Sequence, residues 1–60
     1  MNSLTLSELI PGSFVKNQGH LDWGIGQVQS SINNFVTVNF ENVGKKVIDI
    51  RNINLQIIRL

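Results

Sequence analysis

Apolar and polar residues alternate most regularly over Phe35–Phe40, which reads Phe-Val-Thr-Val-Asn-Phe. Neighbouring side chains of a β-strand face opposite sides, so this period of two predicts a half-buried strand whose second, fourth and sixth residues face inward. The preceding Asn33-Asn34 predicts a tight turn, because asparagine adopts positive φ at low cost. A strand over Gly24–Ser31 then completes a central hairpin.

Weaker alternation on either side of the hairpin predicts three further strands. A Pro11-Gly12 turn precedes the first of them, and a short 3₁₀ turn over Arg51–Asn54 precedes the last. These strands are expected at Ser13–Asn17, Lys45–Ile50 and Leu55–Leu60. The whole pattern predicts an all-β protein, a small five-stranded antiparallel barrel over residues 11–60 that follows a short N-terminal arm over residues 1–10.

The same period assigns the side chains that face inward. They are mostly aliphatic: Val15, Val28, Val36, Val38, Phe40, Ile48, Ile50, Ile53 and Leu55, with Ile32 and either Ile57 or Ile58 at the margins. Gly24 and Gly26 share the inward phase of Val28, and glycine there gives the sheet room to bend sharply, as barrel corners require. Within the N-terminal arm, Leu6 or Leu9 is expected to pack over an open end of the barrel.

Composition limits both the size of the fold and its chemistry. Sixty residues make one domain with a thin core. The chain has no cysteine and a single histidine, so neither a disulfide nor a metal or cofactor site is expected. The net charge of +1 is too small to indicate a nucleic-acid or membrane partner by itself. No apolar run approaches the ~20 residues that span a bilayer, and no secretion signal is recognisable, so a cytoplasmic location is the default expectation.

Two features could suggest an enzyme. His20 and Asp22 could form an acid–base pair, but a polar loop is the simpler interpretation, because a general base must be positioned within hydrogen-bond reach of its substrate. Gly24-Ile25-Gly26 lacks the third glycine and the following helix of a dinucleotide-binding loop. We therefore expect no catalytic activity and no small-molecule substrate.

The candidate binding residues fall into two groups. Trp23 is either a cap over the barrel end or an anchor for a protein partner, because tryptophan serves in both roles. Phe14, Phe35 and Ile25 are predicted to face outward and could join it in a partner-binding surface. The alternative is a nucleic-acid-binding patch, which would require the basic residues to gather on one side: Lys16, Lys45, Lys46 and Arg51.

Four stretches of the chain are also familiar: Pro11-Gly12-x-Phe14-Val15-Lys16, Asp22-Trp23-Gly24-x-Gly26-Gln27-Val28, Val36-Thr37-Val38-Asn39-Phe40-Glu41 and Gly44-Lys45-Lys46. Over roughly Ile10–Ile58 they closely resemble the bacterial domain-of-unknown-function family 3553. The spacing of the valines and glycines is more distantly similar to the Tudor-like C-terminal domain of UvrD and PcrA helicases, and to the RNA-polymerase-interacting domain of CarD-type proteins.

These distant resemblances imply an SH3-like (Tudor-like) barrel, which agrees with the alternation pattern. They also suggest a free adaptor that docks on RNA polymerase or on a transcription or repair factor. Similarity of fold does not carry function across. The leading hypothesis is therefore a non-catalytic protein-binding module that docks through a sheet edge or through the face of Trp23 and Phe14. The alternative is a nucleic-acid-binding module that uses the basic residues with an exposed aromatic side chain.

Overall fold

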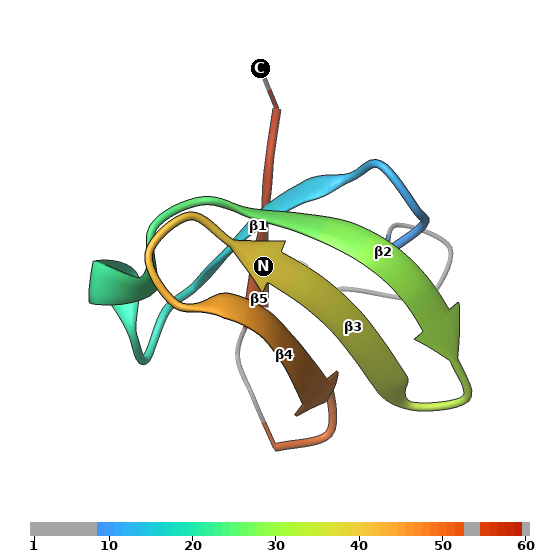
Figure 1. Ribbon diagram of the computed structural model, residues 1–60. Coiled ribbons are helices and arrows are strands. Elements are labelled where there is room, and N and C mark those ends of the chain that lie inside the picture. Colours follow the sequence, from blue (N-terminus) through green and yellow to red (C-terminus); the bar gives the residue numbers. More distant parts are fainter. Residues whose placement is uncertain (1–8, 53–54, 60) are drawn as a thin grey trace.

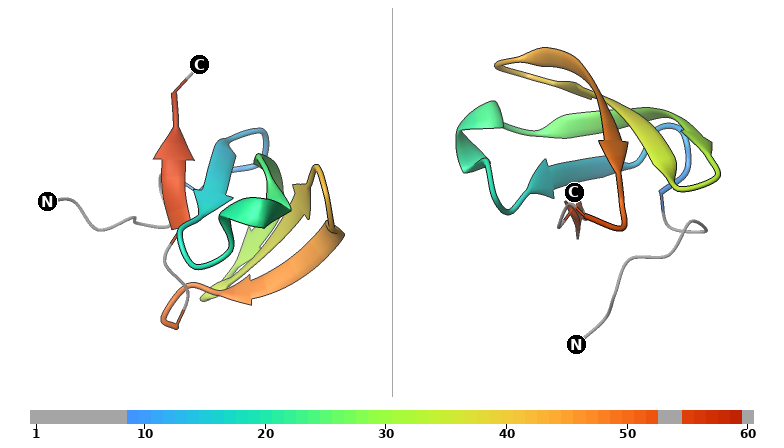
Figure 2. Two further views of the ribbon diagram at one scale, coloured as in Figure 1. Left: turned by 90° about the vertical axis from the view of Figure 1, so that its left-hand side faces the viewer. Right: turned by 90° about the horizontal axis from the view of Figure 1, so that it is seen from below.

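The computed structural model describes residues 9–52 and 55–59, which form a single five-stranded antiparallel sheet with one 3₁₀ turn (Figure 1). The elements are β1 (Phe14–Asn17), η1 (Leu21–Trp23), β2 (Gly26–Ile32), β3 (Phe35–Phe40), β4 (Gly44–Asp49) and β5 (Leu55–Ile58). The strand order is β4-β3-β2-β1-β5. Figure 2 shows the sheet bending, so that β1 and β5 at one end run across β3 and β4 at the other. The chain is an all-β protein with the small five-stranded barrel fold that the alternation predicts, and this fold is SH3-like, as the distant resemblances imply.

One face of the curved sheet encloses the core. The buried apolar side chains are Leu9, Val15, Val28, Val36, Val38, Phe40, Ile48 and Leu55. All but Leu9 belong to the inward set predicted from the period of two, and Leu9 was expected over the barrel end. Ile50 and Ile57 are partly buried and pack against this cluster. Residues 1–8 of the predicted arm, which include Leu6, lie outside the described residues, as do Ile53 and Leu60.

Ile32 is not at the margin of the core, contrary to the prediction, and is 67% exposed. The cause is a β-bulge in β2: Val28 pairs with Val38, but Ser30 pairs with Thr37, so Gln29 is an extra residue. A bulge of one residue reverses the faces of the side chains that follow it. Ile32 therefore points outward beside its cross-strand neighbour Phe35.

The two glycines of the predicted bend have different roles. Gly24 is not part of a strand; it ends η1 with φ of 80°, so β2 begins two residues later than predicted. Gly26 is buried and faces the core, as predicted. A Cβ atom there would lie 2.7 Å from two ring carbons of Phe40 and would also clash with Val38. The close approach of β2 to this ring therefore requires glycine.

Two of the predicted turns are confirmed, whereas the 3₁₀ turn predicted over Arg51–Asn54 extends beyond the described residues and the described 3₁₀ turn is η1. Ser13 N–H donates to the Ile10 carbonyl across Pro11-Gly12, and Asn33 has φ of 56° in the two-residue loop of the β2–β3 hairpin. Strands β4 and β5 end slightly earlier than predicted, at Asp49 and Ile58. The described part of the chain contains no helix with the length and hydropathy to cross a membrane.

Candidate protein-binding groove

An open groove of about 540 Å³ crosses the sheet near the turn between β3 and β4. Its lining residues are Phe14, Ile25, Gly26, Gln27, Asn39, Phe40, Glu41, Asn42 and Gly44. Strand register explains why these residues meet. Phe14 pairs with Gln27, and Gln27 pairs with Asn39, so three outward side chains form one row across β1, β2 and β3.

This row continues to both edges of the sheet. Ile58 of β5 lies opposite Phe14, and Lys45 of β4 lies opposite Asn39. Along the row the outer face therefore changes from apolar, at Ile58 and Phe14, through two amides to a cation. The groove occupies the apolar and amide part of this row.

Ile25 at the rim of the groove is held in place by the turn that follows β3. Its N–H donates to the Glu41 carboxylate at 2.8 Å, and its carbonyl accepts the Glu41 N–H at 3.0 Å. Asn42 adds two hydrogen bonds, from its N–H to the Trp23 carbonyl at 3.0 Å and from its side-chain amide to the Asp22 carbonyl at 2.9 Å. Because residues 22–25 are hydrogen-bonded to Glu41 and Asn42, the position of Ile25 is fixed, with 38% of its surface exposed.

Trp23 lies beside the groove rather than in it. Its ring is edge-on to the buried Phe40, with ring centroids 5.1 Å apart. The His20 ring stacks on it at 4.5 Å, and Lys46 Nζ lies 5.4 Å from its centroid. With an apolar ring below and two polar side chains against it, Trp23 has the position of a cap over the core, one of its two predicted roles.

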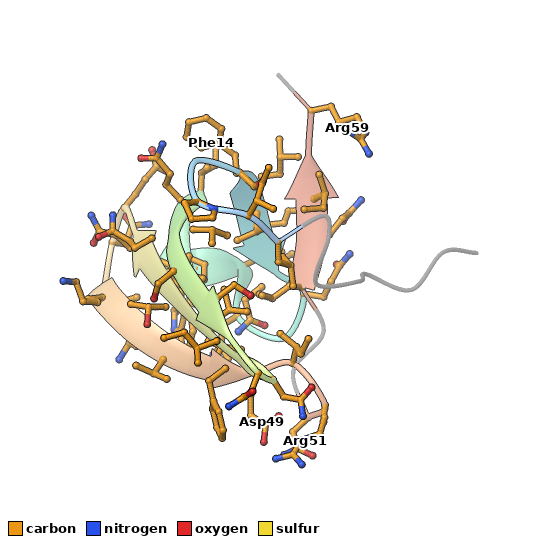
Figure 3. The ribbon with its side chains drawn as sticks, turned by 90° about the vertical axis from the view of Figure 1, so that its right-hand side faces the viewer. Phe14, Asp49, Arg51 and Arg59 are labelled. Carbon is orange, nitrogen blue, oxygen red and sulfur yellow. The ribbon has the colours of Figure 1, made fainter. Side chains whose placement is uncertain are left out.

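Phe35 is separated from the other predicted partner-binding residues. It lies on the outer face of β3, between Ile32 and Asp49 in the strand register, and 47% of it is exposed. Val47 of β4, 67% exposed, is its diagonal neighbour. Figure 3 shows Phe14 on one side of the molecule and Asp49 on the other. The structure thus brings Phe14 and Ile25 together in the groove, with Trp23 adjacent and Phe35 on a different part of the surface.

The four basic residues of the predicted nucleic-acid-binding patch do not gather on one side of the molecule. Lys16 lies on β1 and Lys45 on β4, with two strands between them. Lys46 is opposite the buried Val38 and extends to Trp23. Arg51 binds Asp49, with its guanidinium 2.7 Å from the carboxylate (Figure 3).

The contact between Asp49 and Arg51 also shifts the pKa of both side chains. Hydrogen bonds from the Arg51 side chain, together with its backbone N–H, hold the pKa of Asp49 below its ordinary value. The same side-chain contact raises the pKa of Arg51. The pair closes the turn after β4, where Asn52 N–H also donates to the Asp49 carbonyl at 3.0 Å.

The other titratable pair is more open. His20 Nδ1 lies 4.0 Å from an Asp22 carboxylate oxygen, and both side chains are largely exposed. His20 is also stacked on Trp23. Among residues 9–52 and 55–59, no three histidine or acidic side chains gather in a group that could hold a metal ion.

Sequence reasoning placed Gln27 and Asn39 on the outer face but did not identify them as neighbours of Phe14 and Ile25. Alternation determines the face of each residue, whereas its lateral neighbours depend on pairing between strands that are distant in sequence.

The comparisons with known proteins locate the chain within a family. No curated protein and no solved structure matches it. A family model described as a protein of unknown function, DUF3553, matches residues 9–58, from the buried Leu9 to the last residue of β5. This match spans the whole described sheet, and the chain therefore belongs to the DUF3553 family.

Proposed function

We propose that this chain is a non-catalytic protein-interaction module that binds an extended segment of a partner protein in the groove beside Phe14 and Ile25. The observation that supports this most directly is the composition of the groove, an apolar rim next to the exposed amides of Gln27 and Asn39. Apolar side chains provide burial, and an amide both donates and accepts hydrogen bonds. A peptide backbone offers the same two kinds of group, so the lining is complementary to an extended chain.

The charges at the groove favour protein over nucleic acid as the partner. Among the described residues that line it there is no lysine or arginine, and the carboxylate of Glu41 accepts the Ile25 N–H. Binding of a phosphate backbone depends on several cations acting together. The alternative nucleic-acid site has less support, because Lys16 and Lys45 are on separate strands and Arg51 is paired with Asp49.

The choice of partner rests on resemblance. The Tudor-like domains of UvrD and PcrA helicases and the CarD-type domains suggest RNA polymerase, or a transcription or repair factor, in the cytoplasm. We adopt RNA polymerase as the partner to test.

The test measures binding of the full chain to immobilised, purified bacterial RNA polymerase. The main variant is Ile25→Asp, and the matched control is Ile32→Asp, which places the same charge at an exposed isoleucine outside the groove. A partner can bury the 38% of Ile25 that is exposed, which contributes about 1 kcal/mol. Because Ile25→Asp also places an unpaired carboxylate in the contact, it should weaken binding at least ~10-fold. Ile32→Asp should leave it unchanged.

Three results would count against the proposal in different ways. Equal binding by wild type and Ile25→Asp removes the groove as the site, and loss of binding with Ile32→Asp moves the site to the Phe35 surface. Failure of the wild type to bind removes RNA polymerase as the partner. A parallel titration with duplex DNA at ~50 mM salt, where phosphate contacts are strongest, tests the nucleic-acid alternative.

A further inference from the structure

The outer edge of β4 has no partner among the described strands. β4 is the last strand in the sheet order, and its register is with β3 alone. An open edge carries backbone N–H and C=O groups that can pair with another strand. Which residues present these groups follows from the bonds on the other side of β4.

The backbone hydrogen bonds show which residues of β4 bond to β3 and which face the open edge. Ile50 N–H donates to the Asn34 carbonyl, which identifies the even-numbered residues of β4 as those bonded to β3. Independently, Glu41 N–H donates to the Ile25 carbonyl, so the odd-numbered residues of β3 are bonded to β2 and its even-numbered ones to β4. Lys45, Val47 and Asp49 therefore direct their backbone groups away from β3, along the open edge.

These three residues also share the outer face, and in order they are a cation, an apolar residue and an anion. An antiparallel partner with the same sequence reverses that order. When the pairing is centred on Val47, Val47 meets its own copy, Lys45 meets Asp49 of the second copy, and Asp49 meets its Lys45.

Other registers are less favourable. Centring the pair on Lys45 or on Asp49 would place like charges opposite each other, which is destabilising in a sheet. Centring the pair on Lys46 would place Lys46 opposite Lys46 of the second copy. Centring it on Ile48 would place Val47 opposite Asp49 of the second copy. Only the arrangement about Val47 matches opposite charges on both sides.

We propose that two copies of this chain associate through β4 across a two-fold axis at Val47, continuing the sheet from one copy into the other. The contact forms two backbone hydrogen bonds between the valines. Each copy adds one more, from its Asp49 N–H to the Lys45 carbonyl of the other copy. The Asp49 carbonyl is not needed, since it already accepts from Asn52. This inference is independent of the groove and does not depend on the proposed function.

The side chains near the axis also suit a second copy. Val47 is 67% exposed, and its diagonal neighbour Phe35 is 47% exposed. Pairing across β4 covers Val47 on the outer face and brings the apolar surface around Phe35 next to that of the second copy. Lysine at a strand edge usually discourages pairing, but here Lys45 faces a carboxylate. Since Arg51 already binds that carboxylate, the added charge selects the register more than it adds affinity.

An interface of one strand from each copy is small, so we expect a weak dimer with Kd in the range of about 10 μM to 1 mM. Sedimentation equilibrium of the full chain should show this association. Lys45→Asp, which sets a carboxylate against the Asp49 carboxylate of the second copy, should weaken it at least tenfold. Lys16→Asp is the matched control, because it makes the same change of charge on β1, and it should behave as wild type.

A charge exchange keeps the proposal testable if one variant is poorly folded. K45D alone and D49K alone should each be monomeric, whereas an equimolar mixture should form a heterodimer, because each protein then meets opposite charges. Circular dichroism checks that each variant is folded, and the double variant K45D/D49K should recover self-association in one chain.

The proposal is overturned if the wild-type chain stays monomeric to about 1 mM. It is equally overturned if K45D associates as strongly as wild type while folded. The groove is tested separately by Ile25→Asp with RNA polymerase, so either idea can fail while the other stands.

Discussion

The strictest steric requirement in the fold is at Gly26, which makes Gly26→Ala the most informative stability variant. A Cβ atom there would lie 2.7 Å from Cδ1 and Cε1 of Phe40. Carbon atoms in normal contact are about 3.5–4.0 Å apart, so the ring must move by roughly 1 Å. Phe40 is 2% exposed and its ring packs edge-on against Trp23, so a shift of this size disturbs the packing of the core.

Overpacking of this kind costs about 1–3 kcal/mol. Alanine also reduces the entropy of the unfolded chain, which offsets about 0.4–1 kcal/mol. The net loss is therefore about 1–2 kcal/mol, and since 1 kcal/mol shifts the Tm of a domain this size by about 4–8 °C, the Tm should fall by roughly 5–15 °C. Such a loss is a large part of the total stability of about 3–5 kcal/mol for a core this small.

Thermal unfolding followed by circular dichroism measures this effect, with Gly19→Ala as the matched control. At Gly19 a Cβ atom would lie 3.4 Å from Asn17 Oδ1, an ordinary contact, so the same substitution should be neutral or slightly stabilising. Phe40→Leu in combination should remove part of the cost of Gly26→Ala, because the clash with the ring is removed and the clash with Val38 remains. Equal Tm values for Gly26→Ala and Gly19→Ala would refute the packing of β2 against Phe40.

Two further predictions concern the turns. Asn33→Ala should lower the stability by about 1 kcal/mol, because alanine lacks the tolerance of asparagine for positive φ, whereas Asn33→Gly should be nearly neutral by the same unfolding assay. Asp49 should titrate by NMR below the ordinary value of about 3.9, and Arg51→Ala should return its pKa to that value. Because the folded pKa is lowered, the stabilisation from this pair is present at neutral pH and is lost as the pH falls through the folded pKa of Asp49; an unchanged pKa in Arg51→Ala would contradict it.

The alternation of residues was sufficient to predict the strands and most of the core. It worked because each strand has one buried face, so a period of two in the sequence corresponds directly to burial, as at Val36 and Val38. The bulge at Gln29 could not be predicted in this way. Ser30 and Ser31 are small and polar and fit either face, so the sequence carried no signal that the phase changes before Ile32.

The candidate site was predicted only in part, for a related reason. Alternation showed that Phe14 faces outward, and Ile25 was expected beside it. It could not show that Gln27 and Asn39 complete their surface, because lateral neighbours depend on the register between strands. The position of Trp23 was also undetermined, since its contact with Lys46 joins η1 to β4, two segments that are distant in sequence.

The size of the chain explains why its candidate chemistry lies on the outer face and the edge. In a chain of 60 residues nearly every inward position is needed for the core, and within residues 9–52 and 55–59 the buried side chains are apolar except Asn17. A pocket inside such a fold would remove side chains whose burial the stability depends on. The outer row from Ile58 through Phe14, Gln27 and Asn39 can instead vary at little cost to folding, as can the edge at Val47. The inner face therefore specifies the barrel, and the two proposed interactions, with a different protein at the groove and with a second copy at the β4 edge, use surface that the core does not need.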